Sequence, residues 1–165
     1  LYQRCQNEFL PEVAAELGVP IILQHIQGSP KNMQQDPRYV SVVPEVLQGL
    51  KDSADRALAA GVRPENIIVD PGFGFGKRLE HNLTLLARLA ELRTLGYPVL
   101  SGTSRKSMIG IALQVPPHER MEGTGATVCL GIQKGCQIVR VHDVKPIARM
   151  VRMMDVMLKG TVVNG

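Results

Sequence analysis

The sequence of 165 residues has no tryptophan, only three cysteines and only 4% aromatic residues. The cysteines are odd in number, and no two of them have CxxC spacing (Cys5, Cys129 and Cys136). This pattern argues against a disulfide framework and against a zinc site. It fits a reducing compartment, so we expect a cytoplasmic protein.

Long apolar runs are also absent. No stretch approaches the roughly 20 apolar residues that a membrane-spanning helix needs, so we expect no membrane partner. The amino end carries Arg4, Glu8 and Glu12 and lacks the leading apolar core of a signal peptide. Because the first residue is Leu1 rather than methionine, we expect the chain to begin inside a longer one.

Strong charge of either sign is lacking as well. The net charge is +4, and the basic residues are spread along the chain. With few aromatic residues to stack on bases, a nucleic-acid surface has little support, and we expect no nucleic-acid partner. A small anionic substrate fits the same charge.

What the sequence does contain is a repeated unit. A helical stripe of apolar residues, a closing glycine, a short apolar strand and a polar loop follow one another four times. The closing glycines are Gly18, Gly61, Gly96 and Gly135. Parallel strands are predicted near residues 21–27, 66–70, 98–103 and 137–142. Helices are predicted over residues 8–17, 44–60, 82–95, 125–134 and 143–158, with Asn82 and Asp143 as N-caps.

Each predicted strand ends in polar side chains, and this favours a barrel. In an open doubly wound sheet, only the strands beside the switch point need such ends. In a TIM (β/α)8 barrel, every strand points its carboxyl end at one shared site. We therefore predict an α/β fold in which residues 1–165 form about half of a TIM barrel domain. Because an isolated half would leave two open sheet edges, we expect the other units upstream or in another chain.

The most informative stretch is IIVDPGFGFGK, from Ile67 to Lys77. It places Asp70 at the end of a buried strand, before glycines that allow a sharp turn or close approach to a ligand. The glycine spacing matches neither a Walker A loop nor GxGxxG. A carboxylate suits the N–H donors of a heterocycle better than a phosphate, and Phe73 or Phe75 could flank such a ring. A plain strand end with a flexible turn remains the alternative.

Two further stretches suit an anion. GTSRKS places Arg105 and Lys106 at a strand end, and RVHD places Arg140 and His142 on one side of a strand. The alternatives are solvated basic residues at a helix start and an Arg140 paired with Asp143. No nucleophile–base pair stands out, and the four histidines show no metal-ligand spacing.

Taken together, DPGFGFGK, GTSRKSMIG, RVHDV and QHIQGSPKNMQ resemble the dihydropteroate synthase family of pterin-binding (β/α)8 barrels. The resemblance implies that this chain carries the last four β/α units of such a barrel. It also implies a transferase of folate biosynthesis, which joins 4-aminobenzoate to 6-hydroxymethyl-7,8-dihydropterin diphosphate and releases diphosphate. The family further implies a sulfonamide target, a homodimer formed through the last helices, and Mg2+ held by the amino-terminal half, with no metal ligand in this chain.

The resemblance also implies roles for individual residues. Asp70 is similar to the carboxylate that binds the pterin, and Lys106 to a lysine that contacts the pterin and aminobenzoate. Arg140 would bind pterin and diphosphate and His142 would bind diphosphate, so that Lys106, Arg140 and His142 form the catalytic set. The aminobenzoate region is implied to contain Gly74, Phe75 and Ser104.

This sequence also departs from the family. Gln24, near the pterin position, stands where the family commonly has methionine. The asparagine-bearing strands that complete the family's site have no counterpart, so we expect this chain alone to be inactive. Two alternatives stay open: a pterin-binding barrel of the methyltetrahydrofolate methyltransferase type, and a catalytically silent half-barrel that binds pterin or a partner chain.

Overall fold

The computed structural model describes residues 2–4, 9–28, 33 and 36–160. The predictions for Cys5, for a helix start at Glu8 and for most of the segment from Ser29 to Gln35 lie outside the described residues. The strands are β1 (Tyr2–Arg4), β2 (Ile21–Gln24), β3 (Ile67–Asp70), β4 (Leu100–Ser101) and β5 (Ile138–Val139). The helices are α1 (Leu10–Leu17), α2 (Val42–Ala59), α3 (Leu79–Ala87), α4 (Ser107–Leu113), α5 (Met121–Gln133) and α6 (Val144–Lys159). Short 3-10 turns are η1 (Pro64–Asn66), η2 (Leu89–Leu95) and η3 (Pro117–Glu119).

The strands of the described residues are all parallel and lie side by side in chain order. β1, β2 and β3 pair directly, with Gln24 beside Asp70 at the carboxyl end of the register. A parallel bridge between Val69 and Val99 joins this group to β4, which pairs with β5. Because the order never reverses, the described strands contain no switch point of a doubly wound sheet, and the arrangement is that of a barrel segment.

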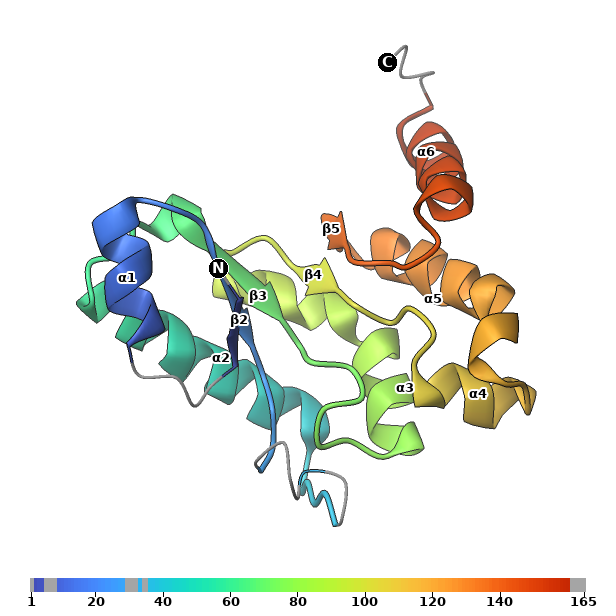
Figure 1. Cartoon of the computed structure of the whole chain (residues 1–165), viewed down its shortest axis with the longest axis horizontal. Coiled ribbons are helices and arrows are strands. Elements are labelled where there is room, and N and C mark those ends of the chain that lie inside the picture. Colours follow the sequence, from blue (N-terminus) through green and yellow to red (C-terminus); the bar gives the residue numbers. More distant parts are fainter. Residues whose placement is uncertain (1, 5–8, 29–32, 34–35, 161–165) are drawn as a thin grey trace.

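The helices cover one side of this row of strands (Figure 1). α2 does so through an apolar stripe of helical period, in which Val43, Val46 and Leu50 are fully buried. These side chains form one core with strand residues such as Ile21 and Val69. α6 lies at the end of the row, beyond β5, and packs on α5. No helix within the described ranges is long and apolar enough to cross a membrane.

The four predicted units are present, and the glycines that close them behave as predicted. Gly18, Gly61, Gly96 and Gly135 all have positive φ angles, between 63° and 92°. In this left-handed region a glycine avoids the Cβ clash that other residues meet. The periodic glycines therefore mark the true ends of the helical segments.

Several boundaries differ from the prediction. All four predicted strands are shorter. The residues after β2, β4 and β5 leave the ladder to form loops of the site, whereas β3 keeps its predicted end at Asp70 and starts one residue later, at Ile67. β1 was not predicted, and the SMIGIAL stretch forms a separate helix, α4. The third helix begins at Leu79 rather than at Asn82 and gives way to η2, and its N-cap is Arg78. Asn82 is instead a buried side chain with a different role, described below.

Candidate functional site

The predicted site residues lie at the carboxyl ends of three neighbouring strands. Asp70 is the last residue of β3, Ser104 follows β4, and Arg140 directly follows β5. The backbone N–H of Arg140 donates to the carbonyl of Ser101 over 3.0 Å, which keeps the two strand ends together. The sequence prediction that these polar ends converge on one edge is therefore confirmed.

Asp70 is buried, with 1% of its surface exposed. Its Oδ1 accepts the backbone N–H of Gly72 over 2.7 Å, and its Oδ2 accepts the side-chain N–H of Gln24 over 3.0 Å. An ionised carboxylate has about four acceptor positions, so each of its oxygens can accept more than one such bond. Gln24, which departs from the family pattern, thus contacts the carboxylate that the resemblance assigns to the pterin.

The glycines of the loop serve two different purposes. A Cβ on Gly72 would lie 1.9 Å from the backbone oxygen of His25, and one on Gly76 would lie 2.3 Å from that of Gln27. These two glycines let the loop pack against the segment after β2 rather than against a ligand, which corrects part of the sequence interpretation. Gly74 instead faces the side chain of Lys106: a Cβ on Gly74 would lie 3.4 Å from Cδ of Lys106.

The two phenylalanines of the loop have different surroundings. Phe73 is 1% exposed and belongs to the core. Phe75 is half-buried, and Nζ of Lys106 lies 4.2 Å from the centre of its ring, within the range of a cation–π contact. Phe75, and not Phe73, is therefore the one placed with other predicted site residues.

A cavity of about 570 Å³ opens beside Lys106. Its lining includes Ser104, Lys106, Arg140 and His142, so three basic side chains border one space. Ser104 fixes the histidine: its Oγ is 2.8 Å from Nδ1 of His142 and accepts the backbone N–H of His142 over 3.1 Å. This arrangement suits a ligand with more than one negative charge.

Arg105 also borders this cavity, but it is neutralised by an ion pair. Its guanidinium donates to both oxygens of Asp143, over 3.0 Å from Nε and 2.6 Å from Nη2. These bonds hold the pKa of the Asp143 carboxyl below its usual value. This pairing of Arg105 with Asp143 was not predicted from the sequence.

A buried polar cluster under the glycine loop was not predicted. Nζ of Lys77 lies 3.1 Å from Nδ1 of His25 and from the backbone oxygens of Gly72 and Phe75. Asn82 accepts the backbone N–H of Gly74 over 2.8 Å and donates to the backbone oxygen of Arg78 over 2.7 Å. The only signal in the sequence was that the glycine run ends in a lysine.

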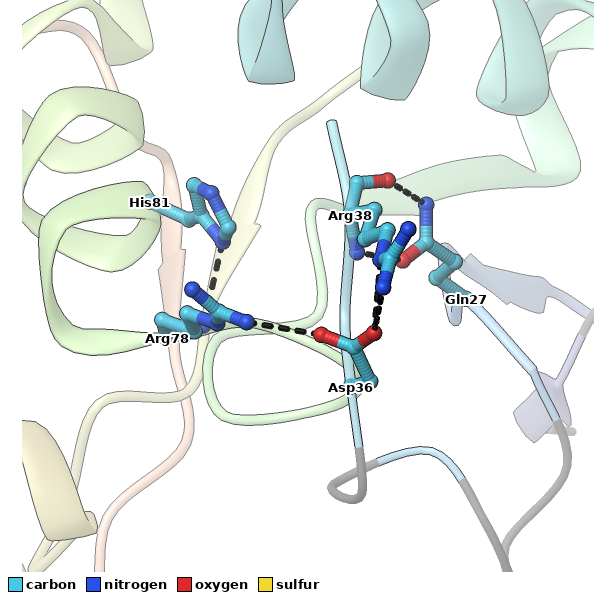
Figure 2. A network of polar contacts seen from close by, with 5 residues as sticks. All are labelled: Gln27, Asp36, Arg38, Arg78 and His81. Carbon is cyan, nitrogen blue, oxygen red and sulfur yellow. Dashed lines mark hydrogen bonds and ion pairs between the residues drawn. The ribbon is translucent and has the colours of Figure 1, made fainter. Parts of the chain in front are cut away.

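The outer side of the same loop is joined to the segment after β2 by a surface network (Figure 2). Asp36 pairs with Arg38 over 2.6 Å and with Arg78 over 2.7 Å. The Gln27 side chain donates to the backbone oxygen of Arg38 and accepts its N–H. The backbone N–H of Arg78 donates to Nδ1 of His81 over 3.1 Å. The glycine loop is therefore held from both its buried and its exposed side.

Metal ligands do not gather in the described part of the chain. No three His, Cys, Asp or Glu side chains there lie close enough to hold an ion. The cavity is lined by three cations, Arg105, Lys106 and Arg140, and by no carboxylate of the described residues, which is a poor donor set for Mg2+.

Parallel strands whose carboxyl ends carry a buried carboxylate and a cation-lined cavity define part of a β/α barrel with a candidate binding site at that edge. The chain belongs to the pterin binding enzyme family, whose model matches residues 3–142.

The relatives are consistent with this membership. The chain is 53% identical to a dihydropteroate synthase of Bacillus subtilis (strain 168) over 157 residues, which cover 94% of this chain and 53% of that protein. A second dihydropteroate synthase, from Escherichia coli (strain K12), is 46% identical over 147 residues, which cover 89% of this chain and 52% of that protein. The chain therefore spans about half the length of the curated relatives it matches.

Solved structures give the same result for the fold. A Yersinia pestis dihydropteroate synthase with a sulfonamide drug complex matches with a TM-score of 0.90 and 41% identity, covering 93% of this chain and 56% of that one. The Thermus thermophilus enzyme in complex with 4-aminobenzoate matches with a TM-score of 0.89 and 39% identity, and the match covers 95% of this chain and 66% of that one. The predicted family resemblance and the predicted partial TIM barrel are both confirmed.

Proposed function

We propose that this chain is the carboxyl-terminal half of a dihydropteroate synthase, a transferase of folate biosynthesis. The reaction joins 4-aminobenzoate to 6-hydroxymethyl-7,8-dihydropterin diphosphate and releases diphosphate. One observation carries the proposal: a buried carboxylate ends β3, and a cation-lined cavity lies at the ends of β4 and β5, the next strands in the row. A pterin diphosphate presents N–H donors at one end and negative charge at the other, so it requires both.

The carboxylate of Asp70 is suited to the amino-pyrimidine edge of the pterin. That edge presents two neighbouring N–H groups, and a carboxylate can accept such a pair. Gln24 already donates an N–H from an amide to the same carboxylate. We infer that the pterin edge competes with this amide for Asp70.

The cavity is suited to the diphosphate. Arg140 can hold phosphate oxygens through two N–H groups, and His142 is oriented by Ser104 at the same wall. When the C–O bond to diphosphate breaks, the leaving group gains negative charge while the pterin methylene becomes cationic. Arg140 and His142 then stabilise the leaving group electrostatically, and the amine of 4-aminobenzoate attacks the methylene. The proton released from the amine passes to solvent or to the leaving diphosphate.

The aminobenzoate would lie beside the place where Lys106 contacts the glycine loop. Phe75 and Gly74 form the loop side of this place, and Lys106 extends across it from the start of α4. The ammonium of Lys106 can there contact both the pterin and the carboxylate end of the second substrate. The Thermus thermophilus relative was solved with 4-aminobenzoate and the Yersinia pestis relative with a sulfonamide, which supports the same ligand classes here.

Further parts of the proposal concern the whole protein. Mg2+ would be held outside the described residues and would neutralise diphosphate charge when bound. The free thiols of Cys129 and Cys136 support a cytoplasmic location. A homodimer through the last helices is supported by α6, which exposes Met153, Met157 and Leu158 to 54–58%.

The methyltransferase alternative has less support. A methyl transfer releases no diphosphate, so it gives no reason for Lys106, Arg140 and His142 to border one cavity. A turnover assay on the full-length protein would distinguish the enzyme from a catalytically silent half-barrel.

Calorimetry on the full-length protein tests the proposal. Wild-type protein should bind 6-hydroxymethyl-7,8-dihydropterin diphosphate, and Asp70→Ala should weaken this binding by about 100-fold because a charged acceptor pair is lost. Asp52→Ala, which removes an exposed carboxylate of α2, is the matched control and should bind as wild type does. Unchanged affinity in Asp70→Ala would refute the assignment of Asp70.

A further inference from the structure

Lys77, the last residue of the glycine-rich stretch, points inward. Only 3% of its surface is exposed. Its Nζ lies 3.1 Å from each of three acceptors, namely the oxygens of Gly72 and Phe75 and Nδ1 of His25. An ammonium has three N–H donors, so these three acceptors match its hydrogen-bonding capacity.

The His25 ring completes this arrangement as a neutral acceptor. Burial, and secondly the positive charge of Lys77, lower the pKa of His25 to about 3. The ring is therefore uncharged at neutral pH, with its lone pair on Nδ1 toward Lys77 and its proton on Nε2. The Tyr39 ring lies on another side of the imidazole, with the ring centres 6.2 Å apart, and Gly49 of α2 packs close to it.

Each acceptor lies next to a contact of the proposed site. Gly72 donates its backbone N–H to Asp70. Phe75 carries the ring under Lys106. His25 directly follows Gln24, whose side chain donates to Asp70. One buried ammonium thus links two backbone oxygens of the loop and the His25 side chain, and these lie next to the groups that set the place of the carboxylate and of the aromatic ring.

We propose that Lys77 is a positioning residue, which holds the loop from Gly72 to Gly76 in the conformation that presents Asp70 and Phe75 to the substrates. It acts through the loop and does not contact substrate. This inference rests on the proposed function. It assigns a task to a charged side chain that the proposed reaction leaves unused.

The test compares two ligands on the full-length protein. Lys77→Met should weaken the binding of 6-hydroxymethyl-7,8-dihydropterin diphosphate by about tenfold or more, because a displaced loop no longer presents Asp70 to the pterin. Inorganic diphosphate, which depends on Arg140 and His142, should bind within about twofold of wild type. A merely structural loss would weaken both ligands equally. Lys51→Met, an exposed lysine of α2, is the control and should change neither.

Unchanged pterin affinity in Lys77→Met, or equal losses for the two ligands, would overturn the proposal. A measurement on wild-type protein does not depend on the variant folding: nitrogen NMR of the His25 ring should show a proton on Nε2 and none on Nδ1 at neutral pH. A proton on Nδ1 would overturn the proposed contact. If wild type binds no pterin diphosphate, the proposed function fails, whereas the ring measurement still reports on Lys77.

Discussion

The side-chain amide of Gln24 donates to Oδ2 of Asp70 over 3.0 Å, and each of the two residues is 1% exposed. The two side chains come from neighbouring parallel strands, at the last pair of their register. A hydrogen bond from an uncharged donor to a buried carboxylate is worth about 1.5–3 kcal/mol. A ligand that approaches Asp70 with its own N–H groups must displace this amide or share the carboxylate with it.

Replacing Gln24 by methionine should therefore have two opposite effects. Without ligand, the variant should lose about 1–3 kcal/mol of unfolding free energy, because a buried carboxylate loses a donor. The affinity for a pterin diphosphate should rise, because Asp70 no longer exchanges one donor for another. Denaturant unfolding and calorimetry measure the two effects. Weaker pterin binding in Gln24→Met would show that the amide assists the ligand rather than competes with it.

Arg140 should matter more for diphosphate than for aminobenzoate. Arg140 borders the cavity together with His142, whereas the aminobenzoate is assigned to Phe75 and Lys106. Arg140→Ala should weaken inorganic diphosphate by about 10- to 100-fold, the loss expected for a charged hydrogen-bonding pair. Binding of 4-aminobenzoate should change by less than about threefold.

The control for Arg140 is Arg149→Ala, which removes an exposed arginine of α6 outside the cavity. It should bind both ligands as wild type does. Equal losses for diphosphate and 4-aminobenzoate in Arg140→Ala would contradict the separate roles.

The glycine loop offers a prediction about stability. Gly72 has a φ of 70°, and a Cβ there would lie 1.9 Å from the His25 oxygen. Gly72→Ala should thus combine backbone strain with a clash against another backbone, and we expect a loss of more than about 4 kcal/mol. Gly18→Ala is matched in φ, at 63°, but meets no atom within 4 Å. It should lose only about 1–2 kcal/mol, the intrinsic penalty of the left-handed region.

Thermal or denaturant unfolding of the two glycine variants gives their losses of unfolding free energy relative to wild type. Similar losses in both would mean that the loop can move away from the segment after β2. The tight packing of the two loops would then not be required for folding.

The sequence allowed the repeat of β/α units to be predicted because helical stripes and closing glycines are local patterns. It also placed Asp70, Ser104 and Arg140 at strand ends, and parallel strands bring such ends together. The pairings among side chains could not be obtained in this way. Arg105 pairs with Asp143 across 38 residues, and Lys77 meets His25 across 52. Such contacts depend on how the loops pack.

Asn82 shows the same limit on a smaller scale. Its residue type is favoured at N-caps, and the apolar stripe that follows it fits a helix start. In the structure, the helix starts three residues earlier, and the Asn82 side chain bonds the glycine loop instead. The local preference for capping was overridden because the buried Asn82 side chain bonds the backbone N–H of Gly74 and the backbone oxygen of Arg78.

The last prediction concerns acid stability. The pKa of His25 is about 3 in the folded protein, against 6.5 for an unperturbed histidine, chiefly because the ring is buried. Between these two values the unfolded chain binds a proton at this site and the folded chain does not. The His25 contribution to stability is therefore fully present above pH 6.5. It falls as the pH is lowered toward 3, by up to about 1.4 kcal/mol per pH unit.

His25→Asn should flatten the acid side of the stability curve, since asparagine cannot take up the proton. Unfolding free energies of wild type and variant, measured from pH 7 to pH 4, give the two slopes. His118→Asn replaces an exposed histidine and is the matched control, whose slope should follow wild type. If His25→Asn keeps the wild-type slope, the His25 ring is not held neutral, and its contact with the Lys77 ammonium is then wrong as well.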